Sequence, residues 1–189
     1  MKASRYRARF QEMTASNFQP EKMIVLDSIA FDRLLWLVPF FFMIHNMEEA
    51  PFMERWYKRL PLKTSIVVST KQFVIAVTLL TLGGFVFTFL GLKIWRQPFG
   101  YLFVLGIQMT LAFNAFVPHV LSTIRFRIYS PGLVSALLIT LPFSFYLFNR
   151  ALAENLLTWN QFWILLGLAP FVMVASAAAS LKIGGVFAK

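Results

Sequence analysis

One histidine and two glutamates stand close together in an otherwise apolar stretch of the sequence. They are His45, Glu48 and Glu49, within the segment LVPFFFMIHNMEEAPF that covers residues 37–52. At spacings of three and four residues, a helix places all three side chains on one face. Two carboxylates on one face repel each other, and apolar surroundings make the ionisation of each costly. A bound metal ion or a shared proton would relieve both problems.

The same groups have a simpler interpretation as the end of a membrane helix. Glu48 and Glu49 would then mark where the helix reaches the headgroups, with His45 extending toward the interface beside them. A membrane helix needs about 20 residues, and the span between Arg33 and Glu54 reaches that length only by including these three groups. Taken alone, this helix supports an interface and a functional site equally.

A second polar cluster surrounds the other histidine of the chain, His119, in the segment FNAFVPHVL. Asn114 precedes it by five residues, and on an ideal helix the two would diverge by about 140°. Pro118 cannot donate to the carbonyl of Asn114 and crowds it, so we expect a kink that changes the phase of His119. The alternative interpretation is a plain proline kink lined by polar groups.

The segment RIYSPG then opens the next apolar stretch. Ser130 is suited to the N-cap position of a helix, and Pro131 to its first turn. The free N–H groups and positive dipole of such an end suit an anion, for example a phosphate or a carboxylate. Tyr129 lies directly before it.

The composition defines the class of fold that must position these residues. The chain has 189 residues, of which 58% are hydrophobic and 14% charged, and its mean hydropathy is +0.66. This is too apolar for a soluble domain and is typical of a polytopic transmembrane helix bundle, an all-α fold. We predict about five spans, at residues 34–53, 73–92, 99–124, 133–148 and 162–181.

The loops between these spans are short, so we expect a single transmembrane helical domain over residues 28–189. Residues 1–27 form a basic N-terminal tail or an interfacial segment. In an up-and-down bundle the ends of the first and third spans lie on the same side. His45 and His119 can therefore approach the same depth.

The net charge of +10 comes from basic residues in the tail and beside the apolar runs. Attraction to lipid headgroups explains them, and no nucleic-acid motif is present. We therefore expect a multi-pass protein of the cell membrane. The 18 Lys and Arg divide equally between the two sides, so only the basic tail favours a cytoplasmic N-terminus. The oligomeric state is left open.

Three motifs in this order resemble the HXXEE-domain family of small integral membrane proteins. They are H-x-x-E-E (His45, Glu48, Glu49), an Asn…His pair (Asn114, His119) and Y-x-P-G (Tyr129, Pro131, Gly132). The resemblance covers residues 34–181. It implies an integral membrane protein of a family suspected of enzymatic activity, but it implies no reaction.

Two histidines and two glutamates form a ligand set that zinc, iron and manganese accept. We expect a divalent metal, zinc before iron or manganese, with three ligands: His45, Glu49 and His119. Glu48 would act as general base on a bound water, although the two glutamates can exchange roles. Asn114 would orient the substrate or polarise a carbonyl, with Tyr129 at the rim. A metal-free site with a histidine base is also open, whereas a di-iron site would need more acids.

The sequence contains no nucleophile elbow, phosphate loop or dinucleotide fingerprint. We therefore expect a metal-dependent membrane enzyme of the hydrolase or transferase type that acts on a lipid or another amphipathic substrate. The competing hypothesis is a non-catalytic proton-coupled transporter or a subunit of a membrane complex. In that case His45 and Glu48 would relay protons.

Overall fold

The computed structural model describes residues 28–61 and 68–188. The predicted basic segment 1–27 lies outside the described residues, so its form and the orientation of the N-terminus stay predictions. The chain divides into one unit of residues 1–31 and another of residues 32–189. The architecture below is that of the second unit, and the single domain expected over 28–189 also stays a prediction.

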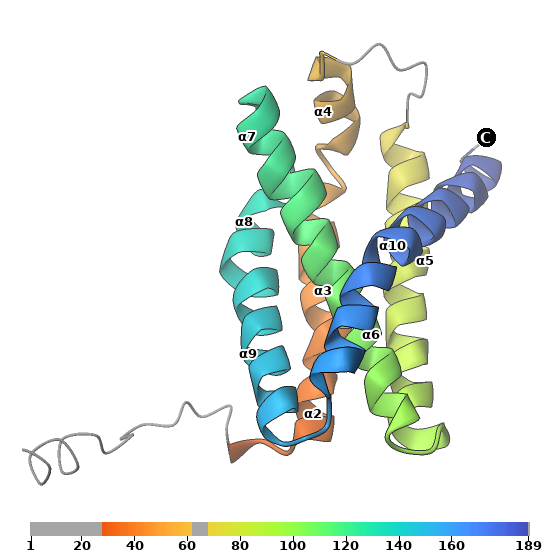
Figure 1. Ribbon diagram of the computed structural model, residues 1–189. Coiled ribbons are helices and arrows are strands. Elements are labelled where there is room, and N and C mark those ends of the chain that lie inside the picture. Colours follow the sequence, from red (N-terminus) through yellow and green to blue (C-terminus); the bar gives the residue numbers. More distant parts are fainter. Residues whose placement is uncertain (1–27, 62–67, 189) are drawn as a thin grey trace, which may run out of the picture. The chain divides into compact units, whose positions relative to one another are not determined.

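All regular elements in the described part of the chain are helical, which confirms the all-α class (Figure 1). In chain order they are α2 (Phe31–Leu35), α3 (Leu37–Glu49), α4 (Met53–Arg59), α5 (Thr70–Phe89), η2 (Leu90–Ile94), α6 (Phe99–Asn114), η3 (Ala115–Leu121), α7 (Ser122–Phe126), α8 (Leu133–Ser135), η4 (Ala136–Thr140), α9 (Leu141–Ala153) and α10 (Trp159–Phe187). Each η segment is a stretch of π-helix that continues an α-helix.

Four of these helical stretches are long and apolar enough to cross a membrane. They are Thr70–Ile94, Phe99–Phe126, Leu133–Ala153 and Trp159–Phe187. Each contains one of the last four predicted spans. Bilayer contact through membrane-spanning helices is therefore a property of this chain.

The first predicted span, residues 34–53, is not one continuous helix. Pro39 has no N–H for the carbonyl of Leu35 and its ring crowds that carbonyl, which explains the turn at Trp36 between α2 and α3. Pro51 comes two residues after the last residue of α3, Glu49, and it also has no N–H to continue the helical hydrogen bonds. The remaining helix α3 has 13 residues, which is fewer than a membrane crossing needs. It packs instead against α5, α6 and η4.

The short helix α4 is tied to the start of α5 by the carboxylate of Glu54. This carboxylate accepts hydrogen bonds from the backbone N–H and the hydroxyl of Thr70, at 2.7 and 2.9 Å, and from Lys58 at 2.6 Å. Trp56 and Tyr57 pack against a buried apolar cluster that joins this region to α5. The helix α4 is thereby placed beside the end of α3 that carries the glutamates.

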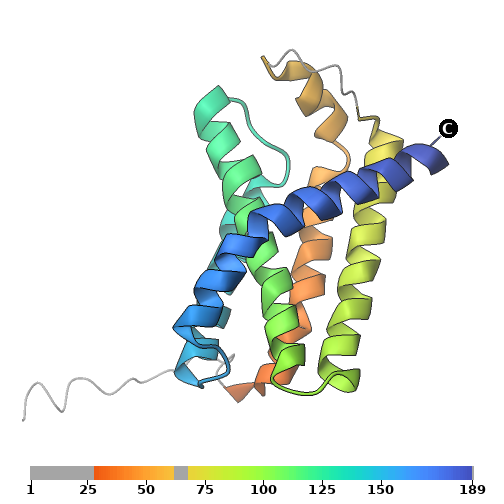
Figure 2. The same ribbon diagram turned by 45° about the vertical axis from the view of Figure 1, so that its right-hand side comes forward.

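Helix α10 crosses over α5 with very little space between the two backbones (Figure 2). Gly184 makes this possible, since a Cβ at this position would lie 2.5 Å from the carbonyl oxygen of Gln72. The side chain of Gln72 donates to the carbonyl of Leu181 at 2.9 Å, one turn before the crossing.

We predict that Gly184→Leu lowers the thermal stability of the purified protein, because the new side chain must push α10 away from α5. Overpacking of this kind costs about 1–3 kcal/mol, more than the gain of about 1 kcal/mol in helix propensity. Gly167→Leu, in the same helix, is the matched control, because a Cβ there meets no atom within 4 Å. Equal melting temperatures of the two variants would contradict the role of Gly184.

Candidate functional site

Helix α3 directs two of its three ionisable side chains into the bundle. His45 and Glu49 are one turn apart and buried, with exposed fractions of 3% and 8%. Their closest polar atoms, His45 Nε2 and Glu49 Oε2, are 3.8 Å apart. Glu48 lies on the neighbouring part of the helix surface, where its carboxylate faces the start of α8 instead.

The π-helical segment η3 brings His119 into the same space. Pro118 leaves the carbonyl of Asn114 without its α-helical donor, and the wider π-turn places residues five apart above one another. Asn114 Nδ2 consequently lies 3.3 Å from His119 Nε2. The predicted change of phase at Pro118 is confirmed, and it is what pairs the two residues.

The side chains from α3 and η3 converge on one point. The Nε2 atoms of His45 and His119 are 3.1 Å apart, with the rings edge to face. Glu49 Oε1 lies 3.9 Å from His119 Nε2, and Asn114 Nδ2 lies 3.4 Å from His45 Nε2. One ligand atom from each of His45, Glu49 and His119 falls within 4.8 Å of the others.

These distances fit a small divalent cation. Ligand atoms about 2.0–2.1 Å from a tetrahedral zinc are about 3.3 Å from one another. The two histidine nitrogens are slightly closer than this, and the carboxylate is farther, with Oε2 3.8 Å from His45 and Oε1 3.9 Å from His119, so Glu49 must move toward the pair to complete the geometry. The cluster of His45, Glu49 and His119 can therefore hold a metal ion.

The other ring nitrogen of His45 contacts a serine at the end of helix α8. His45 Nδ1 is 2.9 Å from Ser135 Oγ, and the hydroxyl of Ser135 donates to the carbonyl of Gly132 at 3.2 Å. With the Ser135 hydroxyl donating to this carbonyl, the serine oxygen is free to accept from His45 Nδ1–H. The lone pair of His45 is thereby placed on Nε2, toward His119.

His119 is oriented in the same sense by the loop before α8. Its Nδ1 is 3.2 Å from Ser130 Oγ, and its ring also bonds to the backbone of Pro131. A proline backbone has only a carbonyl, so His119 is the donor in that bond. Two unprotonated Nε2 atoms then face each other beside a carboxyl group. The Asn114 amide lies within 3.4 Å of both and can donate one N–H group to each. A cation or a shared proton between the two nitrogens would satisfy the same lone pairs.

Glu48 has a different environment from Glu49. Its carboxylate accepts from the Tyr129 hydroxyl at 2.5 Å, from the backbone N–H of Val134 at 3.1 Å and from that of Ser135 at 2.7 Å. An anion was expected at this helix start, and the carboxylate of Glu48 is that anion. The expected N-cap role of Ser130 is wrong, because its side chain faces His119 and the helix begins only after Gly132.

Gly132 allows the loop to lie directly against both imidazole rings. Its φ of +88° disfavours any residue with a side chain. A Cβ here would also lie 2.7 Å from His45 Cε1 and 3.0 Å from His119 Cε1. The glycine of the Y-x-P-G motif is therefore part of the wall of the site.

The sequence analysis missed the two serines that orient the histidines. A signal for them existed, since a buried metal-binding histidine needs an acceptor for its second ring nitrogen. Ser130 and Ser135 flank Gly132 in the segment that had already been selected. All the site residues expected from the sequence lie in this region, with Glu48 and Tyr129 on the side of the loop away from the two Nε2 atoms.

Comparisons with known proteins show which family the sequence of this chain matches. Residues 36–147, which contain all three motifs, match the family model described as "Protein of unknown function with HXXEE motif". The chain is also 24% identical over 154 residues to "Uncharacterized protein YrkK" of Bacillus subtilis (strain 168), covering 80% of this chain and 97% of that protein. No solved structure matches the chain. Since the family match spans more than half of the sequence, this chain belongs to the family of membrane proteins with the HXXEE motif.

Proposed function

We propose that this protein is a metal-dependent membrane enzyme of the hydrolase or transferase type, with His45, Glu49 and His119 as metal ligands. The observation that carries the proposal is the convergence of two Nε2 lone pairs and one carboxylate in a buried space. Two histidines and a glutamate are the protein ligands of several hydrolytic zinc sites, which keep a fourth position open. Zinc is therefore the first choice, and iron or manganese also accept these donors.

A bound divalent metal would supply a water molecule that is ionised near neutral pH and would polarise an ester or amide carbonyl. The residues of this chain orient the partners of that reaction. Asn114 has its amide nitrogen within 3.4 Å of both Nε2 atoms, so it is placed to donate to a substrate oxygen beside them. Glu49 holds its carboxyl group against both imidazoles.

For Glu48, the three hydrogen bonds support a positioning role, whereas the general-base role expected from the sequence stays a prediction. Its carboxylate joins α3 to Tyr129 and to the start of α8. These contacts hold the loop whose residues orient both histidines. Tyr129 acts in this arrangement through Glu48 and stands at the rim of the site.

The membrane setting supports a lipid or another amphipathic molecule as the substrate. His119 belongs to a stretch that is long and apolar enough to cross a membrane, and α3, which carries the other two ligands, packs against such stretches. Its ligands are nevertheless buried, with His119 only 1% exposed. A substrate that partitions into the bilayer can approach such a site from the side of the lipid.

One observation favours a second function, a proton relay in a transporter or in a subunit of a membrane complex. The 3.1 Å between the two Nε2 atoms is an ordinary hydrogen-bond distance. A proton held between the imidazoles, with Glu49 beside them, would satisfy the same lone pairs without a metal.

Elemental analysis of the detergent-purified protein separates the two functions. We predict about one equivalent of zinc, iron or manganese per chain, because the three buried donors are arranged around one point. Glu49→Ala and His119→Ala are expected to lose most of this metal. Glu154→Gln is the control, because this carboxylate pairs with Arg150 outside the cluster, and it is expected to retain the metal.

The result that contradicts the metal site is equally specific. If the wild-type protein, purified gently and without chelators, contains no metal, the proton relay becomes the better account. Metal that is retained in Glu49→Ala would instead place the ion somewhere other than at the proposed ligands.

The contact between Glu48 and Tyr129 predicts a pH dependence at the alkaline end. Burial and the hydrogen bond to the Glu48 carboxylate raise the pKa of Tyr129 from 10.0 to about 12. Because the folded-state pKa is the higher one, this stabilising contribution is complete below pH 10 and is lost as the pH rises through about 12. Melting temperatures should therefore fall more steeply between these pH values in the wild type than in Tyr129→Phe.

Glu48→Gln tests the same contact from the other side, because it removes the charge that holds the tyrosine proton. We expect it to flatten the alkaline slope as Tyr129→Phe does. Slopes equal to that of the wild type in both variants would show that the contact does not hold the loop.

A further inference from the structure

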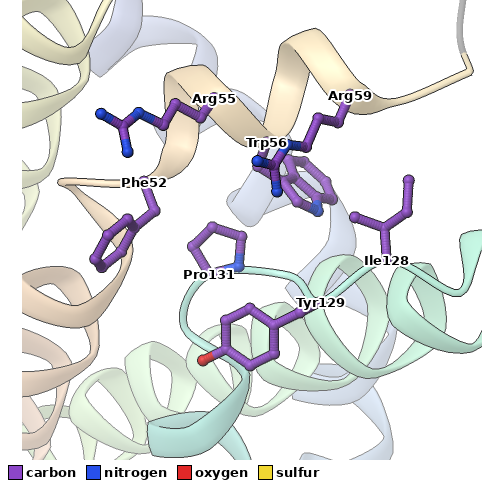
Figure 3. A pocket seen from close by; sticks show the side chains of 7 residues that line it. All are labelled: Phe52, Arg55, Trp56, Arg59, Ile128, Tyr129 and Pro131. Carbon is purple, nitrogen blue, oxygen red and sulfur yellow. The ribbon is translucent and has the colours of Figure 1, made fainter.

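A pocket of about 310 Å³ lies between α4 and the loop before α8 (Figure 3). Helix α4 contributes Arg55, Trp56 and Arg59 to its lining, and the loop contributes Tyr129 and Pro131. The proposed metal ligands do not line it. It is therefore a separate cavity that shares one wall, the loop, with the site described above.

Two positively charged side chains line this pocket. Arg55 and Arg59 are one turn apart. In Figure 3 the Arg59 guanidinium lies beside Trp56 above Pro131, and the Arg55 side chain extends to the other side, above Phe52. Neither forms an ion pair with a residue of the described part of the chain. The nearest carboxylate on the same helix, Glu54, is occupied by Lys58 and Thr70. Among the described residues, neither arginine therefore has an acidic partner, and both can bind an anion in the pocket.

Trp56, which also lines the pocket, does not contribute its indole N–H group to it. The Nε1–H group of Trp56 is buried and forms no hydrogen bond with any described residue. This N–H group is closed off from solvent, so it does not open onto the pocket. The two guanidinium groups match the oxygens of a phosphate, which arginine binds through paired hydrogen bonds.

The rest of the lining indicates what carries the phosphate. Phe52, Pro131 and the rings of Trp56 and Tyr129 give the pocket walls that are mostly apolar. The aromatic and basic residues of α4 are typical of the region where a bilayer meets water. A phosphate joined to an acyl-chain body fits both halves of this surface, whereas a free phosphate would leave the apolar half unused.

The loop connects this pocket to the proposed catalytic cluster. Tyr129 lines the pocket and donates to Glu48 at 2.5 Å. Pro131 lines it and bonds through its backbone to His119. A molecule whose headgroup lies between α4 and the loop is therefore separated from the two histidines by this loop.

We propose that this pocket binds the phosphate headgroup of a phospholipid, held by Arg55 and Arg59. The assignment rests on the proposed function in one respect, since it names a phosphate-bearing lipid as the substrate class of that site. The binding itself is a property of the pocket alone.

The test is native mass spectrometry of the full chain in detergent, with dioctanoyl phosphatidic acid as the probe. Arg55→Gln/Arg59→Gln is expected to weaken its binding at least tenfold, because two charge-assisted contacts are lost. Lys58→Gln/Arg125→Gln is the matched control. It removes the same charge from the same end of the bundle, and neither residue lines the pocket.

Two further probes distinguish the source of the phosphate. Dioctanoylglycerol, which has no phosphate, should bind weakly and equally to wild type and variant. Glycerol 3-phosphate, which has no acyl chains, should bind at least tenfold more weakly than phosphatidic acid. Binding of phosphatidic acid that is unchanged in Arg55→Gln/Arg59→Gln, or equally reduced in the control, would overturn the pocket assignment. Glycerol 3-phosphate binding as tightly as the lipid would overturn the lipid.

Metal content measured on the same samples separates this proposal from the proposed function. We expect Arg55→Gln/Arg59→Gln to keep the metal content of the wild type, since neither arginine touches the ligands. A wild-type protein without metal but with arginine-dependent lipid binding would refute the enzyme and keep the pocket.

Discussion

Two imidazole nitrogens and a carboxyl group meet where the helix bundle leaves no room for water to hydrate them, and this contact constrains everything around it. His45 and His119 present lone pairs to each other across 3.1 Å, with Glu49 just under 4 Å from each. In a low-dielectric interior, a positive charge among the three groups would stabilise this arrangement. On the proposed function, the stability of this end of the bundle and its chemistry would depend on the same ion.

The loop between α7 and α8 determines which atoms meet there. Gly132 lets the backbone lie against both rings, and the serines on either side of it leave the lone pairs on Nε2. The loop itself is held from α3, where Glu48 takes the place of a side-chain N-cap for the helix beyond it. The adjacent glutamates of the motif thus act at different levels: Glu49 lies at the centre, and Glu48 holds the segment that orients the histidines.

Local spacing was enough to predict much of this. Composition gave the helical membrane class, the one-turn spacing gave the common face of His45 and Glu49, and Pro118 gave the pairing of Asn114 with His119. The different environments of Glu48 and Glu49 could not be predicted, because they come from a helix start more than 80 residues away. Pro39 and Pro51 were a local signal that the first predicted span is broken. The prediction of a continuous span relied instead on its apolar residues.

The same loop separates the catalytic cluster from the pocket under α4, so access and chemistry are coupled. The histidines are almost fully buried, and a lipid held by the arginines of α4 can reach them only if the loop moves. Such a movement breaks the Glu48–Tyr129 contact and withdraws the acceptors of both Nδ1 protons. An open loop therefore cannot keep the ligand geometry of the closed one. On the proposed function, the loop would have to close again around the bound headgroup, and water would then be excluded when the two Nε2 atoms are correctly oriented.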